Sequence, residues 1–486
     1  MADLPYQNSI ESDGKDWFYN MDTRIQQFMD ALPGKRVTFC GVGVSNTPVA
    51  ELFARKGAQI TICDKRTREQ LGDVGDRLAK IGARFQLGAD YLAHLDGDMV
   101  FRTPGMKYYL PELTAARRRG IAVTSEMEMF FELCPCPIIA VTGSDGKTTT
   151  TTVISEMLKA QGKKVYLGGN IGTALLPLVE QIAPDDVAVV ELSSFQLISM
   201  RRSPEVAVIT NITPNHLDMH KDMDEYVNAK KNIFLHQTAF GRTVLNKDNE
   251  WTNSFVDETR GQVFQFSRLG EVENGAWLRP DGMIMMRVNG QDTEVFPARD
   301  IRIPGAHNIE NYMTAIAAVW GRVDIETMHQ VARTFPGVEH RAEFVRELDG
   351  VRYYNDSIAT TPSRTISGTL SLFEQKIIVI LGGYDKKIPF DPLGPVVARK
   401  VKIAILLGAT APKIEAALTG CPEYSEGNPA IYRVANLEQA VRLAHQLARR
   451  GDIVSLSPAC ASFDQFPNYE TRGECFKTYV NELGGQ

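Results

Sequence analysis

The residues best suited to chemistry follow a short apolar run that ends at Val141. There the sequence reads Thr-Gly-Ser-Asp-Gly-Lys-Thr-Thr over residues 142–149, and a stretch able to form a helix continues to Ala160. A glycine-rich turn between strand and helix lets backbone N–H groups converge on phosphate oxygens, and Lys147 adds a mobile cation. The Thr148 hydroxyl suits a phosphate-bound magnesium ion. We therefore expect a nucleotide phosphate site at Gly143, Ser144, Asp145, Gly146, Lys147, Thr148 and Thr149.

A carboxylate and an imidazole are expected at the ends of the strands that follow. Glu191 ends one apolar run, and His216 lies just beyond the next, Val206–Asn211. Ligands of open α/β sheets bind at the carboxyl ends of the strands, so these groups could hold a metal ion against the phosphates. A lone histidine is more often a hydrogen-bonded core residue, but the neighbouring Asn211 and Asp218 favour a site.

Polar groups suited to the rest of a nucleotide come later in the chain. Asn308 and Asn311 are amides one helical turn apart, which suits an adenine edge, although Asn308 could also cap a helix. Arg341 offers a forked donor for phosphate, and Asp356, just after a predicted strand, could contact ribose or metal-bound water.

An earlier glycine-rich turn permits a different interpretation. Gly41 and Gly43, with Asp64 at about the usual separation of ~20 residues, resemble a dinucleotide fingerprint, but Asn46 stands where the third glycine is expected. A nicotinamide-dependent dehydrogenase is therefore one alternative. A module that binds ATP without forming a bond is another.

Taken together, the motifs resemble those of the Mur ligase family, which includes the folylpolyglutamate synthetases. Only two residues separate the glycines of the phosphate loop, as in that family's variant loop, and the resemblance runs from about residue 35 along nearly the whole chain. The other matching motifs are Gly169-Asn170-Ile171-Gly172, Glu191-Leu192-Ser193-Ser194-Phe195-Gln196, the segment from Asn211 to Asp218, Ala229-Lys230, His307-Asn308-x-x-Asn311, His340-Arg341-x-Glu343 and Asn355-Asp356-Ser357.

The resemblance implies an ATP-dependent ligase that uses Mg²⁺. The phosphate loop, Asn308, Asn311, Arg341 and Asp356 would bind ATP. The metal ligands would be Thr148, Glu191, His216 and Lys230, the lysine as a carbamate; otherwise Lys230 would be a solvated side chain beside Lys231. The implied catalytic residues are Lys147, His216, Lys230 and Arg341. The UDP part of a substrate would meet Val44, Ser45, Asp64, Arg66, Gly105, Asn170, Ser193 and Gln196.

The segment from Leu456 to Gly473 resembles the family branch that adds D-glutamate to UDP-N-acetylmuramoyl-L-alanine through an acyl phosphate. By that match, the incoming amino acid would meet Thr360, Lys386, Ser462, Phe463 and Tyr469. Two positions depart from the pattern. Ile358 stands where many members have lysine, and Asn215 replaces the more usual aspartate before the histidine.

Alternating strands and helices must position these residues. Three series of short apolar strands separated by helical stretches begin near residues 37, 138 and 351, a pattern typical of parallel sheets. We predict a three-domain α/β protein: an N-terminal extension at 1–33, a Rossmann-like UDP-substrate domain at 34–130, a central ATP-binding domain at 131–338 and a Rossmann-like amino-acid domain at 339–486. The central domain would have a P-loop-type parallel sheet with a small β appendage, marked by a hairpin at Asn289-Gly290.

Composition excludes several other classes of protein. The 486 residues carry a net charge of −6, which gives no general attraction for nucleic acid or anionic membrane. No apolar run approaches the ~20 residues of a bilayer span, and the polar start is not a secretory signal. Cys134-Pro-Cys136 is too tightly spaced for a usual zinc site. We expect a cytoplasmic, monomeric enzyme that acts on small molecules, without nucleic-acid partners or membrane insertion.

Overall fold

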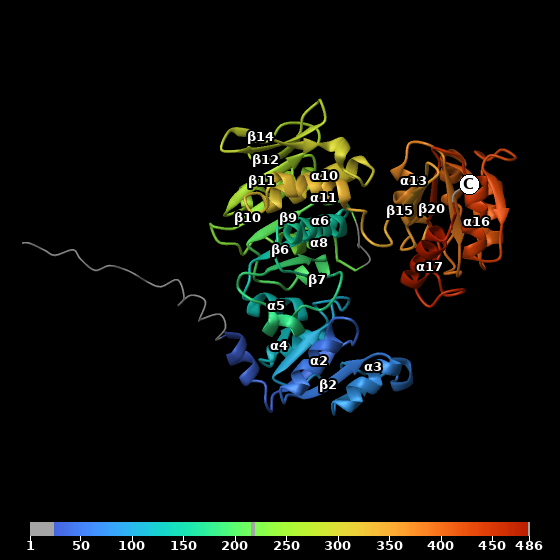
Figure 1. Cartoon of the computed structure of the whole chain (residues 1–486). Helices are drawn as coiled ribbons and strands as arrows, with labels where there is room; N and C mark the ends of the chain where they lie inside the picture. Colours follow the sequence, from blue (N-terminus) through green and yellow to red (C-terminus); the bar gives the residue numbers. More distant parts are fainter. Residues whose placement is uncertain (1–23, 215–218, 485–486) are drawn as a thin grey trace, which may run out of the picture. The chain divides into compact units, whose positions relative to one another are not determined.

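The computed structural model describes residues 24–214 and 219–484 (Figure 1). The chain divides into two units, Met1–Ala298 with Glu310–Val331 and Arg299–Ile309 with Ala332–Gln486. The first unit contains a five-stranded and a nine-stranded sheet, and the second contains a six-stranded sheet. The predicted α/β class with three sheet-based domains is confirmed.

The five-stranded sheet is wholly parallel, with the order β3-β2-β1-β4-β5 of a Rossmann-like half. Its strands are β1 (Arg36–Cys40), β2 (Gln59–Asp64), β3 (Arg84–Leu87), β4 (Met99–Arg102) and β5 (Ala122–Thr124). Its helices are α2 (Asn46–Arg55), α3 (Arg68–Lys80), α4 (Pro111–Arg118) and α5 (Glu126–Leu133). Within the predicted N-terminal extension, residues 24–30 form a helix whose Ile25 and Met29 join the same core as Phe53, and residues 1–23 lie outside the described residues.

The nine-stranded sheet has the order β14-β13-β12-β11-β10-β9-β6-β8-β7, parallel from β7 to β12. Its strands are β6 (Ile138–Thr142), β7 (Val165–Gly169), β8 (Val187–Glu191), β9 (Val206–Ile209), β10 (Arg242–Asn246), β11 (Gln262–Ser267), β12 (Gly275–Leu278), β13 (Met283–Val288) and β14 (Gln291–Pro297). Every residue of β6 and β8 is buried, as expected for strands covered on both faces. The antiparallel β13–β14 pair confirms the predicted hairpin.

The six-stranded sheet of the second unit has the order β15-β16-β20-β17-β18-β19. Its strands are β15 (Glu343–Leu348), β16 (Val351–Asn355), β17 (Ile377–Gly382), β18 (Val401–Leu407), β19 (Ala430–Arg433) and β20 (Ile453–Leu456). Only the edge strand β15 is antiparallel to its neighbour. The helices of this unit that follow β16 are α12 (Pro362–Ser367), α13 (Thr369–Leu372), α14 (Leu393–Lys400), α15 (Ala411–Thr419), α16 (Leu437–Leu447) and α17 (Tyr469–Asn481).

The helices of the central region carry or flank most of the predicted nucleotide residues. They are α6 (Lys147–Ala160), α7 (Ser194–Leu197), α8 (Met223–Lys231), α9 (Glu250–Ser254), α10 (Ala306–Val319) and α11 (Ile325–Thr334). The loop before α6 starts from β6, an interior strand of the sheet that lies between β8 and β9. Over residues 24–214 and 219–484, no helix combines the length and the apolar character needed to cross a bilayer.

Candidate nucleotide and substrate site

The phosphate loop joins β6 to α6, as predicted, and two glycines determine its shape. Gly143 has φ +150°, and a Cβ there would lie 1.9 Å from the Thr210 hydroxyl oxygen. Gly146 has φ +78°, and its Cβ would lie 2.5 Å from Asn311 Oδ1. Because both conformations are ones that side-chain-bearing residues rarely adopt, and both places are already filled, only glycine fits.

Residues that follow β9 form hydrogen bonds to the phosphate loop. Thr210 Oγ1 donates to the Asp145 carbonyl at 2.5 Å, and the Asp145 N–H donates to Asn211 Oδ1 at 2.9 Å. β9 therefore ends at Ile209, two residues before its predicted end, because the side chains of Thr210 and Asn211 bind the phosphate loop instead of continuing the strand. The Ser144 hydroxyl meets the Tyr226 hydroxyl at 2.9 Å, which ties the loop to α8 as well.

Lys147 and Asn311 lie against the same loop. Lys147 Nζ donates to the carbonyls of Gly143 at 2.9 Å and Ser144 at 2.8 Å, so its ammonium lies over the turn. Asn311 Oδ1 accepts from Thr150 Oγ1 at 3.2 Å and faces Gly146. Asn308, in the first turn of the same helix, donates from its amide to the Pro304 carbonyl at 2.6 Å. Thr149 is half-buried in the first turn of α6.

An oxygen-rich group lies at the end of β8. Thr148 Oγ1 donates to Glu191 Oε2 at 2.7 Å, and the Asn170 amide donates to Glu191 Oε1 at 2.8 Å. Glu191 is only 1% exposed. A hydroxyl and a carboxylate side by side, next to a phosphate loop, are the ligand types that Mg²⁺ prefers, so these residues fit the implied metal.

Lys230 is buried, which contradicts the solvated alternative. It is 2% exposed, and its Nζ donates to the Gly143 carbonyl at 2.8 Å and lies 3.3 Å from Thr142 Oγ1. Burial lowers the pKa of Lys230 well below its ordinary value, and the charge of Lys147 lowers it further. Lys231, by contrast, forms an ion pair with Glu258. The structure thus places an amine that tends toward its neutral form beside the phosphate loop.

The predicted metal ligand His216 lies outside the described residues, as do Asn215 and Asp218. Residues on either side of that gap are described. His220 is buried, with Nε2 at 2.8 Å from the Ser194 hydroxyl and Nδ1 at 3.2 Å from Glu225. Its ring stacks on Phe195 with centroids 5.1 Å apart.

The predicted UDP-substrate residues of the first sheet gather at its carboxyl edge. Asp64 ends β2 and accepts hydrogen bonds from the Val42 N–H at 3.0 Å and from the Arg66 side chain at 2.8–2.9 Å. Burial acts to raise the pKa of Asp64, but the hydrogen bonds from Arg66 and from the backbone leave it below its ordinary value. Val44 is exposed, Ser45 is half-buried, and Gly105 follows β4 with open space beside its Cα.

The same region bears on the dehydrogenase alternative. The Asn46 side chain is buried at the start of α2 and donates to the Gly41 carbonyl at 2.8 Å. A dinucleotide fingerprint has glycine there so that the helix can approach the strand closely. A carboxamide therefore fills the place where the third glycine is expected.

Ser193 and Gln196 belong to a capping box around α7. The Gln196 N–H donates to Ser193 Oγ at 3.3 Å, and Gln196 Oε1 accepts from the Ser193 N–H and hydroxyl, each at 2.9 Å. Both residues lie just after Glu191, and Asn170 reaches the same carboxylate. Three of the predicted UDP-substrate residues are therefore adjacent to the predicted metal ligands.

Arg341 and Asp356 belong to the second unit. Asp356 directly follows β16 and accepts from the Thr369 and Ser457 hydroxyls, both at 2.8 Å. Burial raises the pKa of Asp356 to about 6, against the effect of those hydrogen bonds. Arg341 is exposed between His340 (φ +60°) and Ala342 (φ +43°), and the Ala342 N–H reaches Asp356 at 3.3 Å.

Four of the predicted amino-acid residues lie on loops that follow strands of the second unit, and the fifth, Tyr469, begins α17. Lys386 is exposed after β17, and the Tyr384 N–H in that loop donates to the Ala461 carbonyl at 2.9 Å, next to buried Ser462. The rings of Phe463 and Tyr384 meet edge-on, 5.9 Å between centroids. Tyr469 accepts at its carbonyl from the Ser357 hydroxyl at 2.8 Å. Thr360 and Ile358 are both half-buried.

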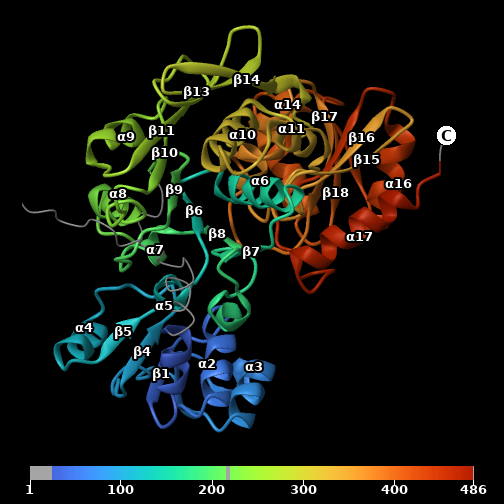
Figure 2. The same cartoon turned by 60° about the vertical axis from the view of Figure 1, so that its left-hand side comes forward.

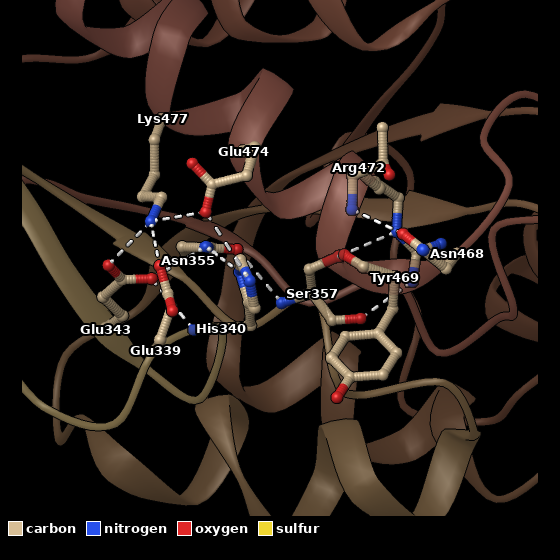
Figure 3. Close-up of polar contacts among 11 residues, drawn as sticks. Glu339, His340, Glu343, Asn355, Ser357, Asn468, Tyr469, Arg472, Glu474 and Lys477 are labelled. Atoms are coloured by element: carbon tan, nitrogen blue, oxygen red, sulfur yellow. Dashed lines mark hydrogen bonds and ion pairs between the residues drawn. The ribbon is translucent and has the colours of Figure 1, made fainter. Parts of the chain in front are cut away.

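Figure 3 shows a charged cluster beside these residues, which sequence reasoning did not predict as a group. Ligand atoms of Glu339, His340 and Glu474 lie within 4.8 Å of one another. Lys477 forms ion pairs with three carboxylates, at 2.7 Å to Glu339, 2.8 Å to Glu474 and 3.3 Å to Glu343. We therefore interpret the cluster as an ion-pair network that holds α17 against the turn carrying Arg341.

Comparison with known proteins decides the family. The UDP-N-acetylmuramoylalanine--D-glutamate ligase of Acetivibrio thermocellus is 52% identical over 95% of this chain and 100% of that protein. The chain belongs to the Mur ligase family. The ligase of the same name from Clostridium botulinum is 47% identical, again over 95% of this Mur ligase and 100% of its relative. Residues 141–319 match the Mur ligase middle domain and residues 340–460 match the Mur ligase, glutamate ligase domain.

Solved structures agree on the fold of this Mur ligase. The UDP-N-acetylmuramate-alanine ligase of Thermotoga maritima has a TM-score of 0.55 at 17% identity, covering 92% of this chain and 100% of its own. A UDP-N-acetylmuramoyl-L-alanyl-D-glutamate--2,6-diaminopimelate ligase has a TM-score of 0.52 at 18% identity, covering 83% and 87%. With the family shown, nothing remains to support a dehydrogenase.

Two arginines and a tyrosine of this Mur ligase were missed by sequence reasoning. Arg102 is 1% exposed and reaches α7, Arg472 is 2% exposed and binds Ser357 and Cys460, and Tyr226 contacts both Ser144 and Lys230. Only Tyr226 carried a usable signal, because it lies one helical turn before Lys230. Phe195 and Ser199, which accept from Arg102, and Ser357, which accepts from Arg472, are about 90 to 115 residues away in sequence.

Proposed function

We propose that this Mur ligase joins D-glutamate to UDP-N-acetylmuramoyl-L-alanine at the cost of ATP, in the synthesis of peptidoglycan precursors. The observation that carries the proposal is the identity of about half of all residues, over nearly the full chain, with relatives that bear this name. We assign the activity to a monomer in the cytoplasm.

ATP would be held by the loop Gly143–Thr149. Its backbone N–H groups and the start of α6 attract the phosphates, and Lys147 can leave the loop carbonyls to contact them. Asn311 lies against the loop and is assigned, with Asn308, to the nucleotide. We assign Arg341 and Asp356 to the same nucleotide on the basis of the family motif.

Thr148, Glu191, His216 and Lys230 are the residues we assign to Mg²⁺. When bound, Mg²⁺ would neutralise charge on the phosphate oxygens. Lys230 fits this set only as a carbamate, because an ammonium would repel a cation. The buried amine, whose pKa is low, supports this assignment, since a neutral amine is the form that adds to carbon dioxide.

The reaction would proceed in two transfers. The carboxylate of the alanyl residue attacks the γ-phosphorus of ATP, and ADP leaves as the acyl phosphate forms. The amine of D-glutamate, in its neutral form, then attacks the acyl carbon, and phosphate leaves as the amide bond forms and the amine loses a proton. No protein nucleophile is needed. Orientation of the bound reactants can contribute on the order of 7–11 kcal/mol, and Lys147 and Arg341 would offset phosphate charge.

The two organic substrates are assigned to different loops. The UDP part would lie at the carboxyl edge of the first sheet, where Asp64 and Arg66 are hydrogen-bonded, and near Asn170, Ser193 and Gln196. D-Glutamate would meet the cation of Lys386, the hydroxyls of Thr360 and Ser462, and the backbone at Phe463 and Tyr469. Hydroxyl, ammonium and N–H donors suit a ligand with two carboxylates.

One assay tests the proposal. Phosphate release is measured with the purified protein, ATP, Mg²⁺ and UDP-N-acetylmuramoyl-L-alanine, while D-glutamate, L-glutamate, L-alanine and a diamino acid are supplied in turn. We expect release with D-glutamate only, and none when either co-substrate is omitted. Lys147→Ala serves as the inactive control. Equal rates with another amino acid would overturn the D-glutamate assignment, and ATP binding without any release would favour the non-catalytic module.

A further inference from the structure

Arg102 joins the two sheets of the first unit. It is the last residue of β4 and is among the largest fully buried side chains. Its Nη2 donates to the Phe195 carbonyl at 2.9 Å and to the Ser199 hydroxyl at 2.7 Å, within and just after α7 (β4 and α7 are labelled in Figure 2). A side chain from the Rossmann-like sheet is thus fixed to a turn of the central domain.

Burying the guanidinium of Arg102 in this way costs folding free energy. The hydrogen-bond partners of the Arg102 guanidinium among residues 24–214 and 219–484 are carbonyls and a hydroxyl, its Nε has none there, and its face lies over the Tyr108 ring. Burial lowers the pKa of Arg102, while the charge of Glu128 acts in the opposite direction. Buried charges without a bonded counter-ion are disfavoured, and apolar side chains of similar volume commonly serve stability better. A role beyond stability would account for the arginine.

The two segments that Arg102 joins both belong to the proposed substrate site. On one side, Thr103, Pro104 and Gly105 follow Arg102 directly, and Gly105 is assigned to the UDP part. On the other side, Phe195 lies between Ser193 and Gln196, which are assigned to the same substrate. The contacts of one guanidinium therefore link the two halves of this site directly.

The turn at α7 needs such support from outside. α7 has only four residues, too few to be stable as an isolated helix. Its start is held by the Ser193–Gln196 capping box, and His220 binds Ser194 and stacks on Phe195 from the α8 side. Arg102 contacts the same turn from the five-stranded sheet.

We propose that Arg102 is a positioning residue for the UDP-linked substrate, which fixes the loop Thr103–Gly105 at the correct distance from the turn Ser193–Gln196. The inference rests on the proposed function, because it concerns the same substrate site. It predicts that loss of the guanidinium impairs use of the UDP-linked substrate and spares use of ATP and D-glutamate.

The test compares Arg102→Met with Arg117→Met. Arg117 is a matched control, because its guanidinium also lies over the Tyr108 ring but its hydrogen bonds go to the Tyr108 carbonyl just before α4 and to the Thr114 hydroxyl within α4. We expect Arg102→Met to raise KM for UDP-N-acetylmuramoyl-L-alanine about tenfold or more, as for the loss of charged hydrogen bonds. KM for ATP and for D-glutamate should stay within about twofold of wild type, and Arg117→Met should leave all three near wild type.

A second variant keeps the test valid if Arg102→Met folds poorly. Ser199→Ala removes one partner of Arg102 and should give a smaller increase in the same KM, with no further increase when combined with Arg102→Met. An unchanged KM for the UDP-linked substrate in Ser199→Ala and in folded Arg102→Met, at wild-type kcat, would overturn the inference. An inactive wild-type protein would instead overturn the proposed function, so the two failures are distinguishable.

Discussion

Lys230 is the side chain whose chemistry depends most on its surroundings. Lys230→Ala should abolish phosphate release, because the buried ligand is lost, while Lys230→Glu should retain some, since a carboxylate can partly replace a carbamate. Lys231→Ala is the matched control, because that neighbour pairs with Glu258, and it should remain active. Mass spectrometry of the native protein and rates with and without dissolved bicarbonate would check the modification. Full activity of Lys230→Ala would contradict the assignment.

Asp356 should make the second unit less stable as pH rises. Its pKa is raised to about 6 in the folded protein, against an ordinary value of 3.8, so the folded state holds the proton more tightly. The contribution of this carboxyl to the free energy of unfolding is therefore greatest below about pH 4 and is lost as pH rises through 6, by about 3 kcal/mol. Asp356→Asn should remove that loss.

The measurement is hydrogen exchange of β16 peptides in both proteins. At pH 8 the Asp356→Asn variant should be better protected than wild type, and at pH 4 the difference should be much smaller. The same variant should lose phosphate release, because the carboxylate is assigned to the nucleotide. Equal protection of the two proteins at pH 8 would show that burial does not perturb Asp356.

Substitution of Lys386 should change KM for the amino acid and not KM for ATP. Lys386→Ala removes a mobile cation and should raise KM for D-glutamate by roughly one to two orders of magnitude, equivalent to about 1.5–3 kcal/mol. KM for ATP should change little. Lys387, adjacent in the same exposed loop, provides the control variant Lys387→Ala. Similar losses in both variants would point to a general effect of loop charge.

For individual residues, the sequence was enough to predict a site role where the partners are near in the chain or the residue belongs to a known motif. Lys147 and Thr148 follow from one loop, whatever surrounds it. Arg102 did not follow, because its partners at α7 lie 93 and 97 residues away and a single charge after an apolar strand is common. The burial of Lys230 was also beyond prediction, since its Nζ contacts the Gly143 carbonyl, 87 residues earlier.

Among the structural elements, the loop before α6 and the turn after it allow a controlled comparison. Gly146→Ala and Gly162→Ala both place a side chain at positive φ, which costs about 1–2 kcal/mol. Only at Gly146 would the new Cβ also strike Asn311, because nothing lies within 4 Å at Gly162. Gly146→Ala should therefore lower ATP affinity about tenfold or more, and Gly162→Ala should lower only the melting temperature. Calorimetric titration with ATP checks both.

Strands were predicted more accurately than their ends. The buried runs of β6 and β8 are apolar enough to be recognised in sequence. The end of β9 was not, because Thr210 and Asn211 suit a strand but bind the phosphate loop instead. α7 was also not predicted as a helix, since its four residues depend on a capping box and on tertiary contacts.

At the scale of the whole molecule, the two units should respond separately to one substrate. UDP-N-acetylmuramoyl-L-alanine without ATP should protect peptides of β1, β4 and α7 from hydrogen exchange, because a ligand stabilises the region that binds it. Peptides of β17 to β19 should exchange as in the free protein. Equal protection in both units would show that the substrate contacts the second unit directly or alters it.

The strand order of the second unit has a consequence for synthesis on the ribosome. β16 can pair with β15 as soon as both are made. Its other neighbour is β20, so Arg352 cannot pair with Ile453 until β20 has been synthesised. Ser457, which binds Asp356, arrives only after that strand. Since chains emerge N-terminus first, the nascent protein holds Asp356 without its serine until almost all of it has been translated. A chain stalled or cleaved before residue 453 would leave β16 as an open sheet edge, a form prone to aggregation.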